Sequence, residues 1–222
     1  MRILIVCSTP AETVFSGLMV NTAKGIVSTV PHQTHQLDVL ITGAGMVSTT
    51  YFLSQILMQG KYDLAINAGI CGAFNKSLMG ISLNVTSDCF ADLGAEEGPS
   101  FLDIFQIGLM DQNEFPFTNG WLKTNYPFNN HVLKELPVVK GITVNTTTGN
   151  ETSIYKLKER YNADTESMEG AAFIYCCRLS NVPCMQVRAV SNLIERRNKV
   201  AWEINKALES LEYTGNKIFS SL

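Results

Sequence analysis

RILIVCSTPAE, at residues 2–12, is the stretch from which the fold of this chain is predicted. Its first part, Arg2–Cys7, is an apolar run rich in β-branched side chains and predicts a buried strand. A turn follows, where Pro10 supplies a backbone φ angle that suits the start of a helix. We predict that this helix ends before Pro31, and its apolar face is marked by Phe15, Leu18, Met19, Thr22 and Ile26.

The same order of strand, turn and helix recurs along the chain. Predicted strands occupy residues 37–42, 62–67, 81–85, 142–147, 163–167 and 185–190. Predicted helices run from the glycine turn at 43–45 to about Gly60, through Leu157, through Tyr175, and at the end along Val200, Ile204, Leu208 and Leu211. Residues 68–72 predict a compact turn, and the segment from 92 to 130 predicts a long irregular excursion.

Strands that alternate with helices favour an α/β layer structure with a largely parallel central sheet. The chain has 222 residues, of which 45% are hydrophobic, so we expect a single domain over residues 1–222. In such sheets ligands bind beyond the carboxyl ends of the strands. The chemistry is therefore sought at the residues that follow each predicted strand.

Charge and cysteine content exclude several classes of function. The net charge is -3 and no stretch gathers basic residues, so neither nucleic acid nor a membrane surface is an expected partner. The apolar run near the start is too short for a signal peptide or a membrane span, which favours a cytoplasmic protein. Six cysteines without a C-x-x-C pair indicate reduced thiols, with neither a disulfide framework nor a metal site.

Two carboxylates follow predicted strands. Glu12 comes just after the first strand, and Glu169 stands where an extended segment turns into a helix. The backbone dipole favours a carboxylate in the first turn of a helix, so a structural role accounts for either residue taken alone. Their combination points to a site.

Five motifs in order along the chain resemble the nucleoside phosphorylase and nucleosidase superfamily. They are RILIVCSTPAE (2–12), ITGAGM (41–46), INAGICGA (66–73), SMEGAA (167–172) and VRAVSN (187–192). Within that superfamily, ADLGAEEG (91–98) and SNLIERRN (191–198) are similar to the futalosine hydrolase branch, which releases a purine from a modified nucleoside during menaquinone synthesis.

The resemblance implies a three-layer phosphorylase/hydrolase-like fold, with a mixed central sheet flanked by helices. It implies hydrolysis of an N-glycosidic bond without metal or cofactor, with hypoxanthine as the leaving base, and a homodimer or larger homo-oligomer. By motif, Glu12 corresponds to the carboxylate that deprotonates the attacking water, and Glu169 to the acid that binds the ribose hydroxyls. Met168 would offer an apolar surface to the sugar, although core packing also accounts for it.

The glycine turns would face the nucleophile. In phosphate-using relatives, Gly45 and the turn around Ile70 help to hold the anion together with arginines, yet no arginine occurs between Arg2 and Arg160. Water is therefore preferred as the nucleophile. Arg188 lies inside an apolar strand and needs a partner there, which is either a site carboxylate or a purely structural group.

Asn192 stands where adenine-directed members of the superfamily carry an aspartic acid that protonates the base. An amide cannot supply that proton, but its NH2 can donate to N7 and O6 of a 6-oxopurine. Hypoxanthine therefore fits this position better than adenine. A structural alternative is that Asn192 caps the final helix.

Other roles stay open. Arg196 and Arg197 could meet a substrate carboxylate or be two solvated charges, and a ring that stacks on the base could come from Phe90 or from residues 101–105. Rival functions are a methylthioadenosine/S-adenosylhomocysteine nucleosidase, a purine nucleoside phosphorylase, and a nucleoside-binding protein without catalysis.

Overall fold

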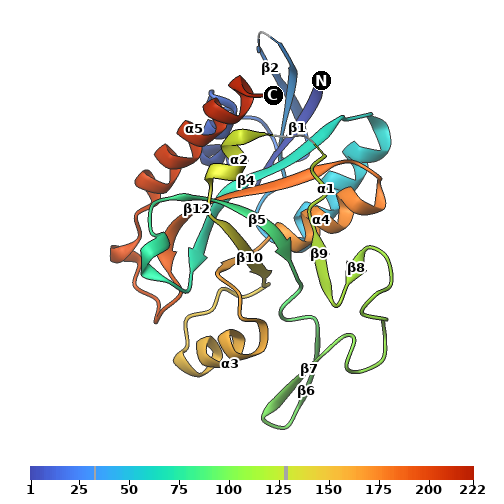
Figure 1. Cartoon of the computed structure of the whole chain (residues 1–222), viewed down its shortest axis with the longest axis vertical. Coiled ribbons are helices and arrows are strands. Elements are labelled where there is room, and N and C mark those ends of the chain that lie inside the picture. Colours follow the sequence, from blue (N-terminus) through green and yellow to red (C-terminus); the bar gives the residue numbers. More distant parts are fainter. Residues whose placement is uncertain (33, 128–129) are drawn as a thin grey trace.

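The first predicted strand lies inside a ten-stranded sheet. The computed structural model describes residues 1–32, 34–127 and 130–222. Here β1 (Arg2–Cys7) pairs in parallel with both β3 (Gln36–Ile41) and β4 (Leu64–Ala73). Both neighbours run in the same direction, so the carboxyl ends of these three strands meet at one edge of the sheet (Figure 1).

Beyond this parallel core the sheet is mixed. Its strand order is β2-β3-β1-β4-β11-β10-β5-β9-β8, while β12 pairs with both β4 and β5 and so closes a ring of five strands. The remaining strands of this sheet are β2 (Val27–Val30), β5 (Ser82–Asp88), β8 (Phe117–Thr118), β9 (Trp121–Lys123), β10 (Val138–Thr143), β11 (Thr165–Ser167) and β12 (Cys184–Leu193). Antiparallel pairs such as β11 with β4 correct the expectation of a largely parallel sheet.

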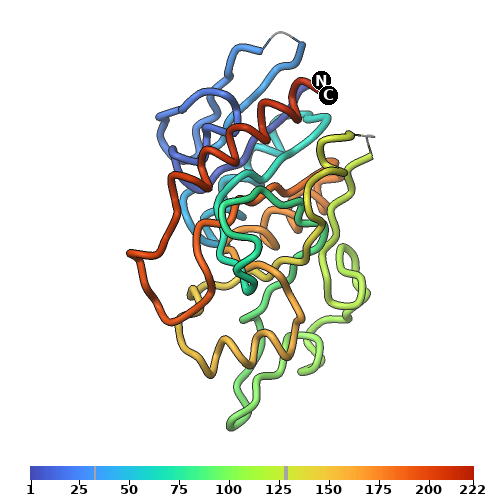
Figure 2. The backbone as a smooth tube through the Cα atoms, turned by 60° about the vertical axis from the view of Figure 1, so that its left-hand side comes forward, coloured from blue at the N-terminus to red at the C-terminus, as the bar shows by residue number. Residues whose placement is uncertain are grey.

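Helices cover both faces of the sheet (Figures 1 and 2). On one face α1 (Met46–Gln59) packs against α4 (Gly170–Leu179), and on the other α5 (Ile204–Ser220) packs against the 3-10 helix Pro10–Ser16. Other helical segments are α2 (His131–Glu135), α3 (Glu151–Tyr161) and the 3-10 turns Lys76–Leu78 and Lys199–Ala201. Among the described residues, no helix has the length and apolar character needed to cross a bilayer.

Alternation along β1 explains why the sheet needs two helical layers. Ile3, Ile5 and Cys7 belong to the core that includes side chains of α5, whereas Leu4 and Val6 belong to the core beneath α1 and α4. Successive side chains of a strand point to opposite faces, so an uninterrupted apolar run must be covered on both sides. The expected three-layer architecture is confirmed.

The predicted helix after Pro10 is wrong in length. It ends at Ser16 as a 3-10 helix, because Gly17 adopts a left-handed backbone conformation with φ of 81°. Leu18, Met19 and Ile26, which suggested a longer apolar face, are exposed. Their spacing is that of an apolar helix face, but in the fold no buried surface lies against these positions.

Other boundaries also needed correction. The compact turn predicted at 68–72 is part of β4, and the strand predicted at 142–147 begins earlier as β10. The segment from 92 to 130 contains regular structure: the hairpin of β6 (Gly94–Glu97) with β7 (Ser100–Asp103), and the hairpin of β8 with β9. Phe128 and Asn129, within that segment, lie outside the described residues. Val200 is 96% exposed and precedes the last helix, which begins at Ile204.

Candidate active site

Glu12 is held by the turn that follows β1. Its Oε2 accepts hydrogen bonds from Ser8 N (3.0 Å), Thr9 N (2.9 Å), Thr9 Oγ1 (3.0 Å) and the Ser8 hydroxyl. Its Oε1 accepts the N–H of Ile70 in β4 at 2.9 Å. Glu12 therefore has the structural role that its position in a first helical turn suggests, and it also bridges the ends of two neighbouring strands.

Glu169 approaches the same edge from α4. It is buried at the N-cap of α4, and its Oε1 accepts the N–H of Gly45 at 3.0 Å. Burial raises the pKa of Glu169 above its usual value, while Arg188 and the Gly45 N–H oppose that shift. A Cβ atom built on Gly45 would have no atom within 4 Å, so there is room beside this contact.

Arg188 joins the two carboxylates. Its Nη1 lies 3.5 Å from Glu169 Oε2 and donates to the Ile70 carbonyl at 3.4 Å. A Cβ on Gly69 would lie 2.6 Å from Arg188 Nη1 and 2.7 Å from Glu12 Oε1. Since both side chains converge over this one glycine, Glu12, Glu169 and Arg188 form one buried cluster.

Asn67 is the partner of Arg188 that the sequence did not identify. Its Oδ1 accepts a hydrogen bond from Arg188 Nη2, and its Nδ2 donates to the Val6 carbonyl at 3.0 Å. Both residues are about 1% exposed. Arg188 therefore has two kinds of partner, a site carboxylate and a structural amide, and both alternatives considered for it are present.

Met168 directly precedes Glu169 and is half-buried. It follows β11, whose last residue, Ser167, accepts the N–H of Gly170 with its hydroxyl oxygen at 3.2 Å. The turn from β11 into α4 thus places Met168 next to Glu169 in the chain.

Asn192 lies further along the same edge. It belongs to β12 opposite Gly72, and its Nδ2 donates to the Leu193 carbonyl at 3.0 Å. Because α5 starts at Ile204, Asn192 does not cap the final helix, and that alternative is wrong. Ile70 and Gly72 are two residues apart in β4, so Asn192 stands roughly 7 Å along the strand from the Glu12 contact.

Asn192 lines a cavity of about 100 Å3. Glu166 and Trp202, which the sequence did not single out, line the same cavity. Glu166 is buried there and accepts hydrogen bonds from the Thr148 N–H (2.8 Å) and hydroxyl. Burial raises the pKa of Glu166, and its bonds to Thr148 oppose the shift. Trp202 supplies an aromatic ring to the same cavity. Neither belongs to a motif, and only the folded loop after β12 brings Trp202 there.

A second cavity of about 670 Å3 adjoins this one and shares Ile194, Glu195, Arg197 and Asn198 with it. Arg196 and Arg197 both line it, together with Lys158 of α3. The Arg197 guanidinium also lies 5.6 Å from the ring centre of Trp202. Both arginines are exposed, and both stand beside the Asn192 cavity.

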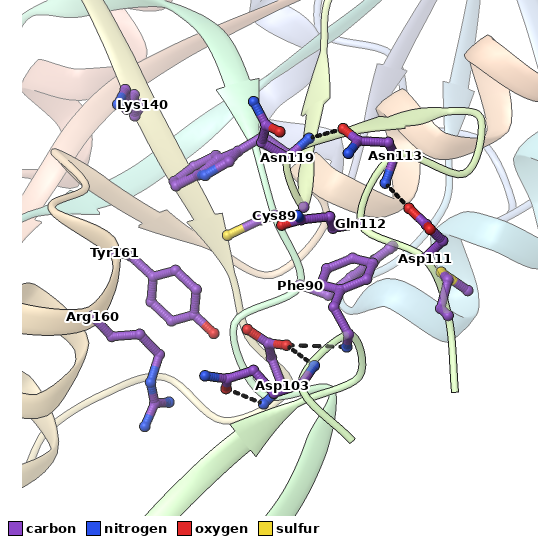
Figure 3. A pocket seen from close by; sticks show the side chains of 15 residues that line it. Cys89, Phe90, Asp103, Asp111, Gln112, Asn113, Asn119, Lys140, Arg160 and Tyr161 are labelled. Carbon is purple, nitrogen blue, oxygen red and sulfur yellow. Dashed lines mark hydrogen bonds between the residues drawn. The ribbon is translucent and has the colours of Figure 1, made fainter. Parts of the chain in front are cut away.

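A separate cavity of about 730 Å3 lies between α3 and the excursion from Cys89 to Trp121. Figure 3 shows Arg160 and Tyr161 of α3 on one side of it and Asn113 on the other. Phe90 and Phe105 line this cavity and pack against Phe117. None of the lining residues belongs to the carboxylate cluster, and neither phenylalanine lines the Asn192 cavity.

Sequence comparison places the chain in a family. Residues 11–219 match the family model of the phosphorylase superfamily. Futalosine hydrolase of Acidothermus cellulolyticus is 30% identical over 213 residues, which cover 86% of this chain and 82% of that protein. Futalosine hydrolase of Streptomyces coelicolor is 32% identical, over 78% of this chain and 74% of that protein.

Solved structures share the fold. A futalosine hydrolase of Helicobacter pylori superposes with a TM-score of 0.79 over 100% of this chain and 98% of its own, at 15% identity. A 5'-methylthioadenosine/S-adenosylhomocysteine nucleosidase from the same organism gives 0.78 over 100% and 98%, also at 15% identity. At 15% identity the structural similarity establishes the fold alone. The family is established by the sequence matches at 30% and 32% identity. The chain belongs to the phosphorylase superfamily and, within it, to the futalosine hydrolases.

Proposed function

We propose that this protein hydrolyses the N-glycosidic bond of futalosine, releasing hypoxanthine and dehypoxanthine futalosine for menaquinone synthesis. The observation that carries the proposal is the buried cluster in which Arg188 meets Glu12 over Gly69 and pairs with Glu169, with the amide of Asn192 further along the same strand edge. The names of its curated relatives support the substrate. Reaction and substrate thus rest on independent observations.

Glu12 activates the water in this proposal. Its Oε2 is engaged by Ser8 and Thr9, whereas Oε1 accepts only the Ile70 N–H among the described residues. Oε1 therefore keeps a lone pair that can accept a proton from water. Breaking the glycosidic bond gives the sugar an oxocarbenium character, so the same carboxylate stabilises the positive charge that develops beside it.

Glu169 binds the ribose. Its Oε1 and Oε2 can accept the vicinal 2′ and 3′ hydroxyls, and Arg188 and the Gly45 N–H hold the carboxylate in place. Met168 covers the sugar with an apolar surface. Ile70 orients Glu12 through its backbone N–H. The sugar would then lie between the two acids, with water on the Glu12 side.

Asn192 contacts the purine. One hydrogen of the Nδ2 group bonds the Leu193 carbonyl, and the other can donate to the N7 and O6 edge of the purine. The carbonyl at position 6 takes up the electron pair of the breaking bond, so the leaving group needs no acid at this position. Trp202, which lines the Asn192 cavity, is the ring that we propose stacks on the base. Arg196 and Arg197, beside that cavity, would meet the carboxylate of the substrate.

We also propose assembly as a homodimer or larger homo-oligomer. The exposed face of α1 carries Val47, Tyr51 and Met58, of which Val47 is 81% and Met58 86% exposed. Exposed apolar side chains gathered on one helix face mark contact surfaces. A second copy of this chain is the partner that we expect on this face.

The decisive experiment incubates the purified protein with futalosine, and in parallel with methylthioadenosine, in phosphate-free buffer. We expect hypoxanthine from futalosine, and a loss of about 10²–10⁴ in kcat in Glu12→Gln. Release of adenine alone would move the protein to the methylthioadenosine/S-adenosylhomocysteine nucleosidases, and dependence on phosphate would indicate a phosphorylase. Binding of futalosine in calorimetry without turnover would indicate a binding protein.

A further inference from the structure

A further buried carboxylate, Asp88, lies beneath the start of α4. It ends β5, is 1% exposed, and takes no part in the chemistry above. Its Oδ1 accepts the hydroxyl of Thr143 at 2.8 Å, and its Oδ2 accepts Nε2 of Gln186 at 2.9 Å. Three strands, β5, β10 and β12, thus meet at this one group.

Thr143 connects Asp88 to α4. The Thr143 hydroxyl accepts the N–H of Ala171, the second residue of α4, at 2.8 Å. Because the hydroxyl proton points to Asp88, a lone pair of the oxygen is left to face Ala171. The first N–H groups of a helix have no partner within the helix, and this bond satisfies one of them. Glu169 is the N-cap of the same helical turn.

Gly170 shows how closely α4 is seated on this group. A Cβ atom at position 170 would lie 2.1 Å from Asp88 Oδ2 and 2.3 Å from Gln186 Oε1. The backbone between Glu169 and Ala171 is therefore pressed against the Asp88 carboxylate. A change at Asp88 must move this backbone or leave its contacts unfilled.

We propose that Asp88 is a positioning residue, whose carboxylate fixes the first turn of α4 through the Thr143 hydroxyl and so sets the place of the Glu169 carboxylate. The inference rests on the proposed function, because it gives Glu169 the task of holding ribose. Nothing in it requires Asp88 to touch the substrate.

The negative charge of Asp88 is not needed for packing. Burial raises the pKa of Asp88 to about 6, so the charge is present at neutral pH against the cost of burial. An asparagine could accept the Thr143 hydroxyl and donate to Gln186 Oε1, which has no hydrogen-bond partner among the described residues. A charge in this place does favour the N-terminus of α4, whose dipole is positive there.

The groups around Asp88 define what can titrate with it. Arg188 on β12 lowers its pKa, and the neighbouring thiols are Cys89, next in the chain, and Cys71 on β4, whose own pKa values are raised by burial. Glu169, on α4, has a raised pKa as well. A pH profile of activity therefore reports several groups, and a probe local to α4 is required.

The test compares Asp88→Asn with Asp164→Asn. Asp164 is a half-buried aspartate whose carboxylate accepts the N–H of Lys140 at 2.9 Å and has no part in the Thr143 contact, so it is the matched control. We expect Asp88→Asn to fold with a raised Tm at pH 7.5 and to lose about tenfold in kcat/KM, mainly through kcat. The neutral amide holds the Thr143 hydroxyl more weakly than the carboxylate does, and transition-state binding depends on the exact place of Glu169. The control should keep wild-type kinetics. Lowered Tm with unchanged kinetics would make Asp88 structural only.

An NMR titration tests the link without substrate. The amide resonance of Ala171 should titrate with a midpoint near pH 6 in the wild type and lose this step in Asp88→Asn and in Thr143→Val. Thr143→Ser, which keeps the hydroxyl, should restore it. An Ala171 amide that shows no such step in the wild type would overturn the proposal. If the step is present but futalosine is not cleaved, only the proposed function fails.

Discussion

At the residue scale, Asn192 is the residue that we propose selects the purine that leaves. Asn192→Asp replaces an amide by a group that can carry a proton to the N7 edge of the base. We expect the ratio of kcat/KM for methylthioadenosine over futalosine to rise about tenfold or more, because a 6-aminopurine needs that proton. Competition assays with the two substrates measure the ratio. An unchanged ratio would mean that Asn192 does not contact the base.

Gly69 leaves the space that the side chains of Glu12 and Arg188 occupy. Gly69→Ala places a Cβ atom within 2.7 Å of both Arg188 Nη1 and Glu12 Oε1. We expect a loss of about 1–3 kcal/mol in the free energy of unfolding, because the buried cluster must shift. Gly149→Ala is the control, since its Cβ would lie at an ordinary 3.7 Å from Arg197. Urea unfolding of both variants distinguishes crowding at Gly69 from a general cost of replacing glycine.

At the scale of the element, we predict that the exposed apolar face of α1 forms the contact between two copies of the chain. Val47→Glu with Met58→Glu places two charges on this apolar face, where desolvation in a contact would oppose association. Light scattering should give at least twice the chain mass for the wild type and the monomer mass for the double variant. A control pair of similar exposure, Leu109→Glu and Tyr155→Glu, lies outside α1 and should leave the mass unchanged.

Elements that bury an uninterrupted apolar run could be predicted from the sequence. β1, β3 and β12 are of this kind, and α1 ends at the glycine expected to stop it. The length of the 3-10 helix Pro10–Ser16 could not be predicted, because the left-handed Gly17 ends it and Phe15 is its one buried apolar side chain. The spacing of apolar residues along the chain predicts which side of a helix could be buried. Whether that side is buried depends on which other elements pack against it.

At the scale of the whole molecule, the carboxyl ends of β1, β4 and β12 meet at one sheet edge, so residues after those strands could be predicted to gather there. Glu12 follows β1 and could be predicted in this way, whereas Ile70 lies within β4 and Glu169 follows β11. Asn67 was missed because its partner Arg188 is 121 positions away, and the contact exists only once β4 and β12 pair. Asp88 was missed for the same reason, since its partners lie on β10 and β12.

Asp88 also makes a prediction about how the stability of the fold changes with pH. Burial raises its pKa from 3.8 to about 6, so between these values the folded state binds a proton that the unfolded chain releases. Its contribution to stability is full below pH 3.8 and is lost as the pH rises through 6, a change on the order of 3 kcal/mol. Asparagine at this position does not titrate, so the stability of Asp88→Asn relative to the wild type should increase from pH 4 to pH 7.5. Urea unfolding of both proteins across this range measures the difference, and a constant difference would mean that Asp88 has the same pKa in the folded and unfolded states.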